Sequence, residues 1–114
     1  VTARAVILAT GATAKRLLDQ VRGLDTVARY GGEEFAILMP DTSFENAMLV
    51  AERVRTSFVK DPLAGPDGRP TLVTISLGVA SAPRNATESQ DLLSKADVAL
   101  YTAKRQGRNQ SVGA

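Results

Sequence analysis

Two patterns of apolar residues run through this chain, one typical of strands and one typical of helices. The segments 26–30 and 34–39 are β-prone and flank two glycines, which predicts an antiparallel hairpin. Apolar and polar residues alternate along 71–80, which predicts a central strand. The apolar positions of that strand are Val73, Ile75, Leu77 and Val79. Residues 109–112 predict a short final strand.

Three segments have the spacing of amphipathic helices. Apolar residues recur at helical intervals within 5–22, which predicts a first helix. Thr42 with Glu45, and later Thr87 with Gln90, have the spacing of capping boxes and predict the starts of two further helices. The expected buried stripes of these two helices are Phe44, Ala47, Met48, Ala51, Val54 and Phe58 in one, and Leu92, Leu93, Ala96, Ala99, Leu100 and Ala103 in the other.

The order of these elements predicts the fold class. Pro40 ends the second hairpin arm because it has no amide donor, and Gly107 is placed to end the last helix. Prolines and glycines between residues 62 and 70 predict a turn-rich connection. We predict an α/β or α+β fold in which helices cover a single mixed β-sheet. A chain of 114 residues, 44 % of them apolar, forms one domain with one core.

Composition excludes several classes of function. Lysines and arginines exceed the acids by only two and form no cluster interleaved with aromatics, so we expect no binding to DNA or RNA. The chain has no cysteine and no histidine, so any metal would be a hard cation held by oxygen. It contains no signal peptide and no run of eighteen apolar residues, so we expect a cytoplasmic location without membrane contact.

The segment Gly31-Gly32-Glu33-Glu34-Phe35 forms the tip of the predicted hairpin. Glycine can take a positive φ and lets another group approach the backbone, so the pair permits both a reversal and a bound ligand. Glu33 and Glu34 should point to opposite faces of the strand, which predicts different roles for them. An ordinary turn with two solvated acids on an edge strand is the alternative interpretation.

These residues resemble the signature of the GGDEF family, the diguanylate cyclases, in its Gly-Gly-Glu-Glu-Phe variant. Arg22-Gly23-Leu24-Asp25 resembles the family's RxxD inhibitory motif, which lies five residues before the glycines. Further segments match in the same order: Leu38–Thr42, Ala51–Arg55, Val73–Ala80 and Ala96–Asn109. The resemblance implies a nucleotidyl-cyclase-like fold with the hairpin at the centre of its single sheet.

The resemblance also implies an activity in bacterial second-messenger signalling. Two GTP molecules would be joined into cyclic di-GMP with release of two pyrophosphates, and a homodimer would bring two domains face to face. Glu33 corresponds to the catalytic residue and ligand of Mg²⁺. The implied substrate-binding residues are Gly31, Gly32, Glu34, Lys104 and Arg108. Lys104 and Arg108 also fit a purely structural interpretation, because cations near a helix end complement its dipole.

A second site is implied by Arg22, Asp25 and Arg53, which correspond to the family's inhibitory site for cyclic di-GMP. An arginine can donate to guanine O6 and N7, and a carboxylate can accept from guanine N1–H and the 2-amino group. An ordinary ion pair between residues three apart is the alternative.

The match to the family breaks near the N-terminus. Family members carry a first strand with a metal-binding aspartate, then a lysine and an asparagine, then a His…Gly-Asp segment that reaches the guanine. A gapless comparison from Arg22 places Ala3 at the histidine and Val6-Ile7 at Gly-Asp. We therefore expect the domain, residues 1–114, to lack the usual first strand and metal-Asp segment. Glu33 alone supplies too few oxygens for Mg²⁺.

Three hypotheses follow from this mixture of matching and missing motifs. The first is a domain that binds cyclic di-GMP at the RxxD site with little or no turnover. The second is an active cyclase, provided that the missing front strand is supplied. The third is a degenerate domain that binds neither nucleotide and contacts partner proteins.

Overall fold

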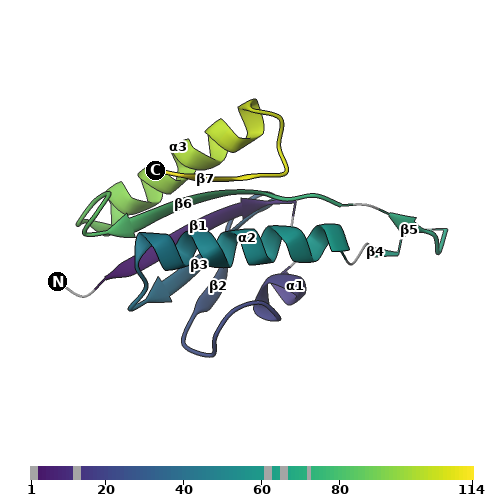
Figure 1. Ribbon diagram of the computed structural model, residues 1–114, viewed down its shortest axis with the longest axis horizontal. Helices are drawn as coiled ribbons and strands as arrows, with labels where there is room; N and C mark the ends of the chain where they lie inside the picture. The colour runs from purple at the N-terminus through teal and green to yellow at the C-terminus, as the bar shows by residue number, and fades with distance from the viewer. Residues whose placement is uncertain (1–2, 12–13, 61–62, 65–66, 72) are drawn as a thin grey trace.

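The computed structural model describes residues 3–11, 14–60, 63–64, 67–71 and 73–114. Its elements are β1 (Arg4–Thr10), α1 (Ala14–Leu18), β2 (Thr26–Gly31), β3 (Glu34–Pro40), α2 (Phe44–Lys60), β4 (Leu63–Ala64), β5 (Pro70–Thr71), β6 (Ser76–Ala82), α3 (Ser89–Arg105) and β7 (Ser111–Gly113). Five strands form one mixed sheet in the order β2-β3-β1-β6-β7, while β4 and β5 form a separate pair. Helices α1 and α2 cover one face and α3 covers the other (Figure 1). The predicted fold class is confirmed, but the hairpin is not at the centre of the sheet, because β2 is an edge strand and β1 is the middle one.

Strand β1 lies in the middle of the sheet and corrects the prediction of a helix over 5–22. It pairs antiparallel with β3 from Arg4↔Pro40 to Thr10↔Glu34, and with β6 over the same seven residues. Residues 5–10 are all buried, because the strand has neighbours on both edges and helices over both faces. Such a strand reads as a continuous apolar run without alternation, so its sequence does not distinguish it from a buried helix.

The position of β1 also corrects the gapless comparison at the N-terminus. Val6 and Ile7, which that comparison aligned with a base-contacting Gly-Asp, are almost completely buried on opposite faces of the sheet. Among the residues that the structure describes between β1 and β2, the one helix is the short α1. The two residues are therefore part of the core.

The two buried layers contain the predicted helical stripes. On the α2 face, Ala47, Ala51, Val54 and Phe58 pack against apolar side chains of β1, β3 and β6. On the α3 face, the buried residues are Val6, Leu8, Ala36, Ala80, Ala82, Leu92, Ala96 and Leu100. A Cβ on Gly78 would lie 2.3 Å from the carbonyl oxygen of Ala96, so α3 lies directly against the backbone of β6. The stripe predictions are confirmed.

Helix α2 does not begin with the predicted capping box. The hydroxyl of Ser43 accepts a hydrogen bond of 3.1 Å from the backbone N–H of Asn46 and so caps the first turn. Thr42 bonds elsewhere, and Glu45 forms an ion pair of 2.8 Å with Arg84. The helix therefore starts one residue later than the pattern predicted.

The predicted ends of the other elements are confirmed in part. No side-chain hydrogen bond caps α3 among the described residues, so the box of Thr87 and Gln90 is wrong. Gly107 has φ +114°, and the next N–H bonds back to Ala103 at 2.9 Å, which confirms the predicted helix end. The short final strand is confirmed as β7, parallel to β6. Residue 72 of the predicted strand and residues 62, 65 and 66 of the connection lie outside the described residues.

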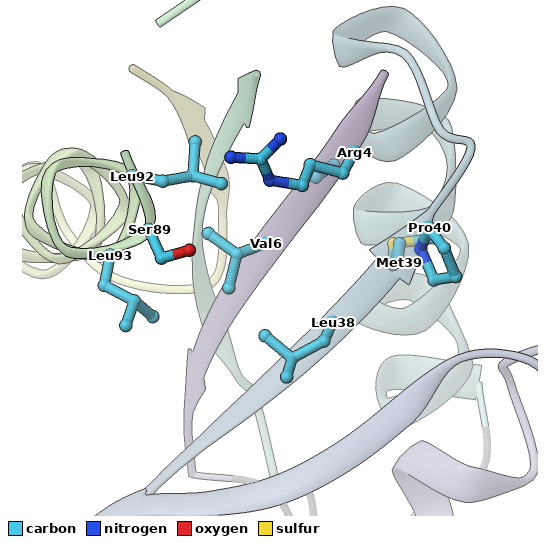
Figure 2. Close-up of a pocket in the computed structure, with 9 residues that line it drawn as sticks. Arg4, Val6, Leu38, Met39, Pro40, Ser89, Leu92 and Leu93 are labelled. Atoms are coloured by element: carbon cyan, nitrogen blue, oxygen red, sulfur yellow. The ribbon is translucent and has the colours of Figure 1, made fainter. Parts of the chain in front are cut away.

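An open apolar hollow of about 360 Å³ lies between α3 and the strands β1 and β3. Figure 2 shows Leu92 and Leu93 of α3 facing Val6 and Leu38 across it, with Arg4 near one end. Leu38 is 42 % exposed, because α3 does not cover the whole of its side chain.

In the described part of the chain, none of the helices combines the length and the hydropathy that a membrane span requires.

Candidate functional site

The tip of the β2–β3 hairpin is a two-residue turn. Gly31 pairs with Glu34, so Gly32 and Glu33 form the reversal. Neither glycine has a positive φ, and a Cβ on either would meet none of the described residues within 4 Å. The folded backbone therefore does not require glycine here. What the two glycines provide is open space above the turn, where a ligand could approach the backbone.

The two signature glutamates have different surroundings. Glu33 is exposed in the turn, whereas Glu34 is partly buried beside Lys104 of α3, with its Oε2 atom 3.8 Å from Lys104 Nζ. Two of the predicted substrate-binding residues are thus brought together. Arg108 lies just beyond α3 with φ +63° and is exposed.

The carboxylates at the tip do not form a magnesium site. Among the described residues, no group of three aspartates or glutamates lies close enough to hold a metal ion. Glu34 is paired with Lys104, and the residue opposite it on β1 is Thr10, which has no carboxylate. Mg²⁺ needs six oxygens in a near-octahedral arrangement, and one or two protein carboxylates usually anchor it. Of the described tip residues, Glu33 supplies one exposed carboxylate, so the other oxygens would have to come from substrate phosphates, water or another residue.

A second polar cluster surrounds Arg22 and Asp25, between α1 and β2. Arg22 donates from Nη2 to Asp25 Oδ1 at 2.8 Å and from Nε to Asp25 Oδ2 at 3.2 Å. The backbone N–H of Arg22 also donates to Oδ2 at 2.9 Å. The Asp25 side chain is 1 % exposed and that of Arg22 is 46 % exposed. This hydrogen-bonded carboxylate raises the pKa of Arg22, which stays charged.

The guanidinium of Arg22 is also attached to the end of β3. Its Nη2 donates to the carbonyl oxygen of Pro40 at 3.0 Å and to the hydroxyl of Thr42 at 2.8 Å. Thr42 in turn donates to the same carbonyl at 2.8 Å. Three acceptors therefore fix the orientation of this arginine.

A hollow of about 130 Å³ lies beside this cluster. Arg53 of α2 borders it and donates to the backbone oxygen of Gln20. The residues that line the hollow are Arg22, Asp25, Met39, Asp41, Thr42, Asn46, Val50 and Arg53. All three residues predicted for the inhibitory site thus meet at one place. The sequence analysis missed Asp41, Thr42 and Asn46, although polar residues immediately after a strand that ends in proline are a usable signal.

The amino-acid sequence matches a known domain family and individual proteins that contain such a domain. Residues 11–110 match the family described as "Diguanylate cyclase, GGDEF domain". The response regulator PleD of Caulobacter vibrioides is 44 % identical over 101 residues, which are 88 % of this chain and 22 % of PleD. The chain thus spans about a fifth of the length of that relative.

Comparison with solved structures extends the match to β1. The GGDEF domain of TpbB from Pseudomonas aeruginosa has a TM-score of 0.91 at 30 % identity, covering 99 % of this chain and 83 % of that one. The GGDEF domain of DgcB from Caulobacter crescentus, solved in complex with c-di-GMP, shares the fold with a TM-score of 0.82 at 22 % identity, covering 98 % and 78 %. Strand β1 precedes the family match in sequence but lies within these structural matches.

Proposed function

The chain belongs to the GGDEF family of diguanylate cyclase domains, and we propose that it binds cyclic di-GMP at the Arg22 hollow with little or no synthesis of it. Binding would use Arg22, Asp25 and Arg53, which line one hollow. Two arginines there suit a ligand that carries two phosphates and two guanines. The structure of DgcB with c-di-GMP shows that a domain of this fold accommodates the ligand.

The observation that carries the absence of turnover is the sequence of β1. In our proposal this strand, Arg4–Thr10, takes the place of the family's first strand, which provides a metal-binding aspartate. It contains no carboxylate, so Glu33 would lack a second acidic partner. Both edges of β1 are paired along its whole length, so an upstream strand could join the sheet only at β2 or β7, away from the middle. This argues against the hypothesis that a supplied front strand restores activity.

Turnover is tested by incubating the chain with GTP and Mg²⁺ and separating the nucleotides by chromatography. We expect no cyclic di-GMP above the level found without protein. A cyclase of the same family, assayed in parallel, controls for the conditions. Product formation that disappears in the Glu33→Ala variant would contradict the proposal, because the tip would then be catalytic as it stands.

Binding is tested by titrating cyclic di-GMP into the chain in a calorimeter. We expect saturable binding that weakens at least about tenfold in Arg53→Ala, because a charged hydrogen-bond donor is lost. Arg69→Ala is the matched control, since Arg69 is exposed and pairs with Asp67 between β4 and β5. If the unmodified chain takes up no ligand, the remaining hypothesis is a domain kept for contacts with other proteins.

A further inference from the structure

Arg22 is held along one edge of its guanidinium group. Nε and Nη2 donate to the two carboxylate oxygens of Asp25, and Nη2 also donates to the carbonyl oxygen of Pro40 and to the hydroxyl of Thr42. Among the described residues, none accepts a hydrogen bond from Nη1. The side chain borders the hollow and is 46 % exposed. The arginine is thus fixed on one side and can donate to a ligand on the other.

The hydroxyl of Thr42 is fixed by the same contacts. It donates its proton to the carbonyl oxygen of Pro40 at 2.8 Å, so its lone pairs are left for Arg22, whose Nη2 atom lies 2.8 Å away. Thr42 is 3 % exposed, and its backbone N–H donates to the carbonyl oxygen of Ala3 at 3.1 Å. A β-branched side chain also has little rotational freedom at χ1. The hydroxyl is therefore a rigid acceptor at the end of β3.

Helix α2 does not use this hydroxyl as its cap. Thr42 and Glu45 have the spacing of a capping box, yet the hydroxyl of Ser43 accepts the hydrogen bond from the first turn. A residue that departs from its local pattern often serves a site instead. Here the departure leads to Arg22, which lines the hollow together with Thr42.

We propose that Thr42 is a positioning residue of the cyclic di-GMP site, whose hydroxyl holds Arg22 against the end of β3 so that the arginine is ordered before the ligand arrives. An arginine side chain loses much rotational freedom when it is fixed, and a site that is ordered in advance avoids this cost on binding. The inference rests on the proposed function, and the contacts assigned there to Arg22, Asp25 and Arg53 stay as they are.

Two substitutions test this role by binding. Thr42→Val keeps the shape of the side chain and removes the acceptor, whereas Thr42→Ser keeps the hydroxyl. Cyclic di-GMP is titrated in a calorimeter into the unmodified chain and into both variants. We expect Thr42→Val to bind about fivefold more weakly, because Arg22 must then be ordered on binding, and Thr42→Ser to stay within about twofold of the unmodified chain.

Ser76→Ala is the matched control. It removes another buried hydroxyl, which accepts a hydrogen bond from the N–H of Asn109. Ser76 pairs with Thr10 of β1, whereas Pro40 pairs with Arg4, so the control lies at the opposite end of the sheet. We expect its affinity for cyclic di-GMP to equal that of the unmodified chain.

A second measurement observes Arg22 directly and needs no ligand. The order parameter of its Nε–H bond, obtained by NMR relaxation, reports how rigidly the guanidinium is held. We expect the value to fall in Thr42→Val and to stay high in Thr42→Ser and in Ser76→Ala. An unchanged order parameter in Thr42→Val would refute the role of Thr42, because the hydroxyl would then not hold the arginine.

The binding results separate this role from the proposed function. If the unmodified chain takes up no cyclic di-GMP, the proposed function fails. If it binds and Thr42→Val binds equally well, only the role of Thr42 is refuted. Tighter binding by Thr42→Val would also refute it, because the hydroxyl would then compete with the ligand for Arg22. An equal loss in Ser76→Ala would refute it too, since the effect would then follow general stability.

Discussion

The hairpin tip and the Arg22 hollow are both built around acids, yet the fold uses them differently. In the hollow, Asp25 is buried, and Arg22 bridges it to β3 through three acceptors. At the tip, Glu33 is exposed in a turn whose glycines have no conformational need to be glycine. The hollow is therefore part of what holds the chain together. The sequence of the tip has no such explanation within the folded domain.

The two motifs therefore relate to stability in different ways. Arg22 and Asp25 form the ion pair between residues three apart that is the alternative to a ligand site. Polar residues that satisfy each other's hydrogen bonds inside the fold can be retained for stability alone. At the tip, by contrast, neither backbone conformation nor packing in the described fold requires the two glycines. The comparison predicts that substitutions in the hollow change stability, whereas substitutions at the tip do not.

The largest effect on stability should come from Arg22→Ala. The variant leaves Asp25 buried with only the backbone N–H as a donor, which should lower the free energy of unfolding more than substitution of Thr42, Glu52 or Glu33 does. Urea unfolding followed by circular dichroism measures the change, with Arg69→Ala as the control. A loss no larger than that of Glu33→Ala would show that the hollow contributes as little to stability as the tip does.

A smaller effect is expected for Thr42→Val, which keeps the shape of the side chain and removes its hydroxyl. Arg22 would lose one acceptor and Pro40 one donor, so we expect a loss of about 1 kcal/mol in urea unfolding. Thr42→Ser restores the hydroxyl and should recover most of it. Equal stability of the valine and serine variants would show that the hydroxyl is not part of the network.

A third prediction concerns the Glu52–Arg55 ion pair on α2. Its carboxylate is exposed, whereas that of the Arg22–Asp25 pair is buried, so the contributions of the two pairs to stability can be compared. Arg55 donates to both carboxylate oxygens at 2.8 and 2.9 Å and lowers the pKa of Glu52. Because the folded pKa lies below the unfolded one, the pair stabilises the domain at neutral pH. That contribution is lost as the pH falls through the folded pKa.

The contribution of this pair should be about 0.5 kcal/mol, because Glu52 is 47 % exposed. Glu52→Gln should therefore lower stability slightly at pH 7 and flatten the decline in acid. Urea midpoints at several pH values between 3 and 7 measure both. Parallel pH profiles of the variant and the unmodified chain would contradict the assignment.

The smallest effects are expected at the tip. Glu33→Ala and Gly32→Ala should each change the free energy of unfolding by less than about 0.5 kcal/mol, because both positions are exposed and a Cβ at Gly32 meets open space. Cyclic di-GMP affinity should also stay the same, since the proposed site lies at the other end of β3. A large loss of stability in either variant would give the tip a structural role and remove the contrast.

Much of the fold could be predicted from the sequence, because amphipathic patterns mark elements that are buried on one side. Helices α2 and α3 are predicted in this way, and glycines predict the hairpin and the helix end at Gly107. Strand β1 was not, because burial on both faces removes the alternation that distinguishes a strand. The capping residues were also missed, since several neighbouring side chains could serve and only local geometry selects one.

Without the family resemblance, which implied Arg53, Lys104 and Arg108, the candidate site was predictable only where its residues are close in sequence. The RxxD motif and the tip are short segments, so their residues could be named in advance. The contact of Lys104 with Glu34 joins segments seventy residues apart, and Asp41 enters the hollow only because β3 ends beside Arg22. Such proximity depends on the packing of the whole sheet.

The double pairing of β1 has a consequence for the order in which the chain can assemble. Its partners are residues 34–40 and 76–82, so β1 is synthesised before both of them and is enclosed only when β6 has been made. Until then an apolar segment from Ala5 to Ala9 is exposed, and contacts this distant in sequence form slowly. If synthesis stopped before residue 76, one edge of β1 would have no partner strand. The incomplete chain would then be prone to aggregation and to binding by chaperones or cleavage by proteases.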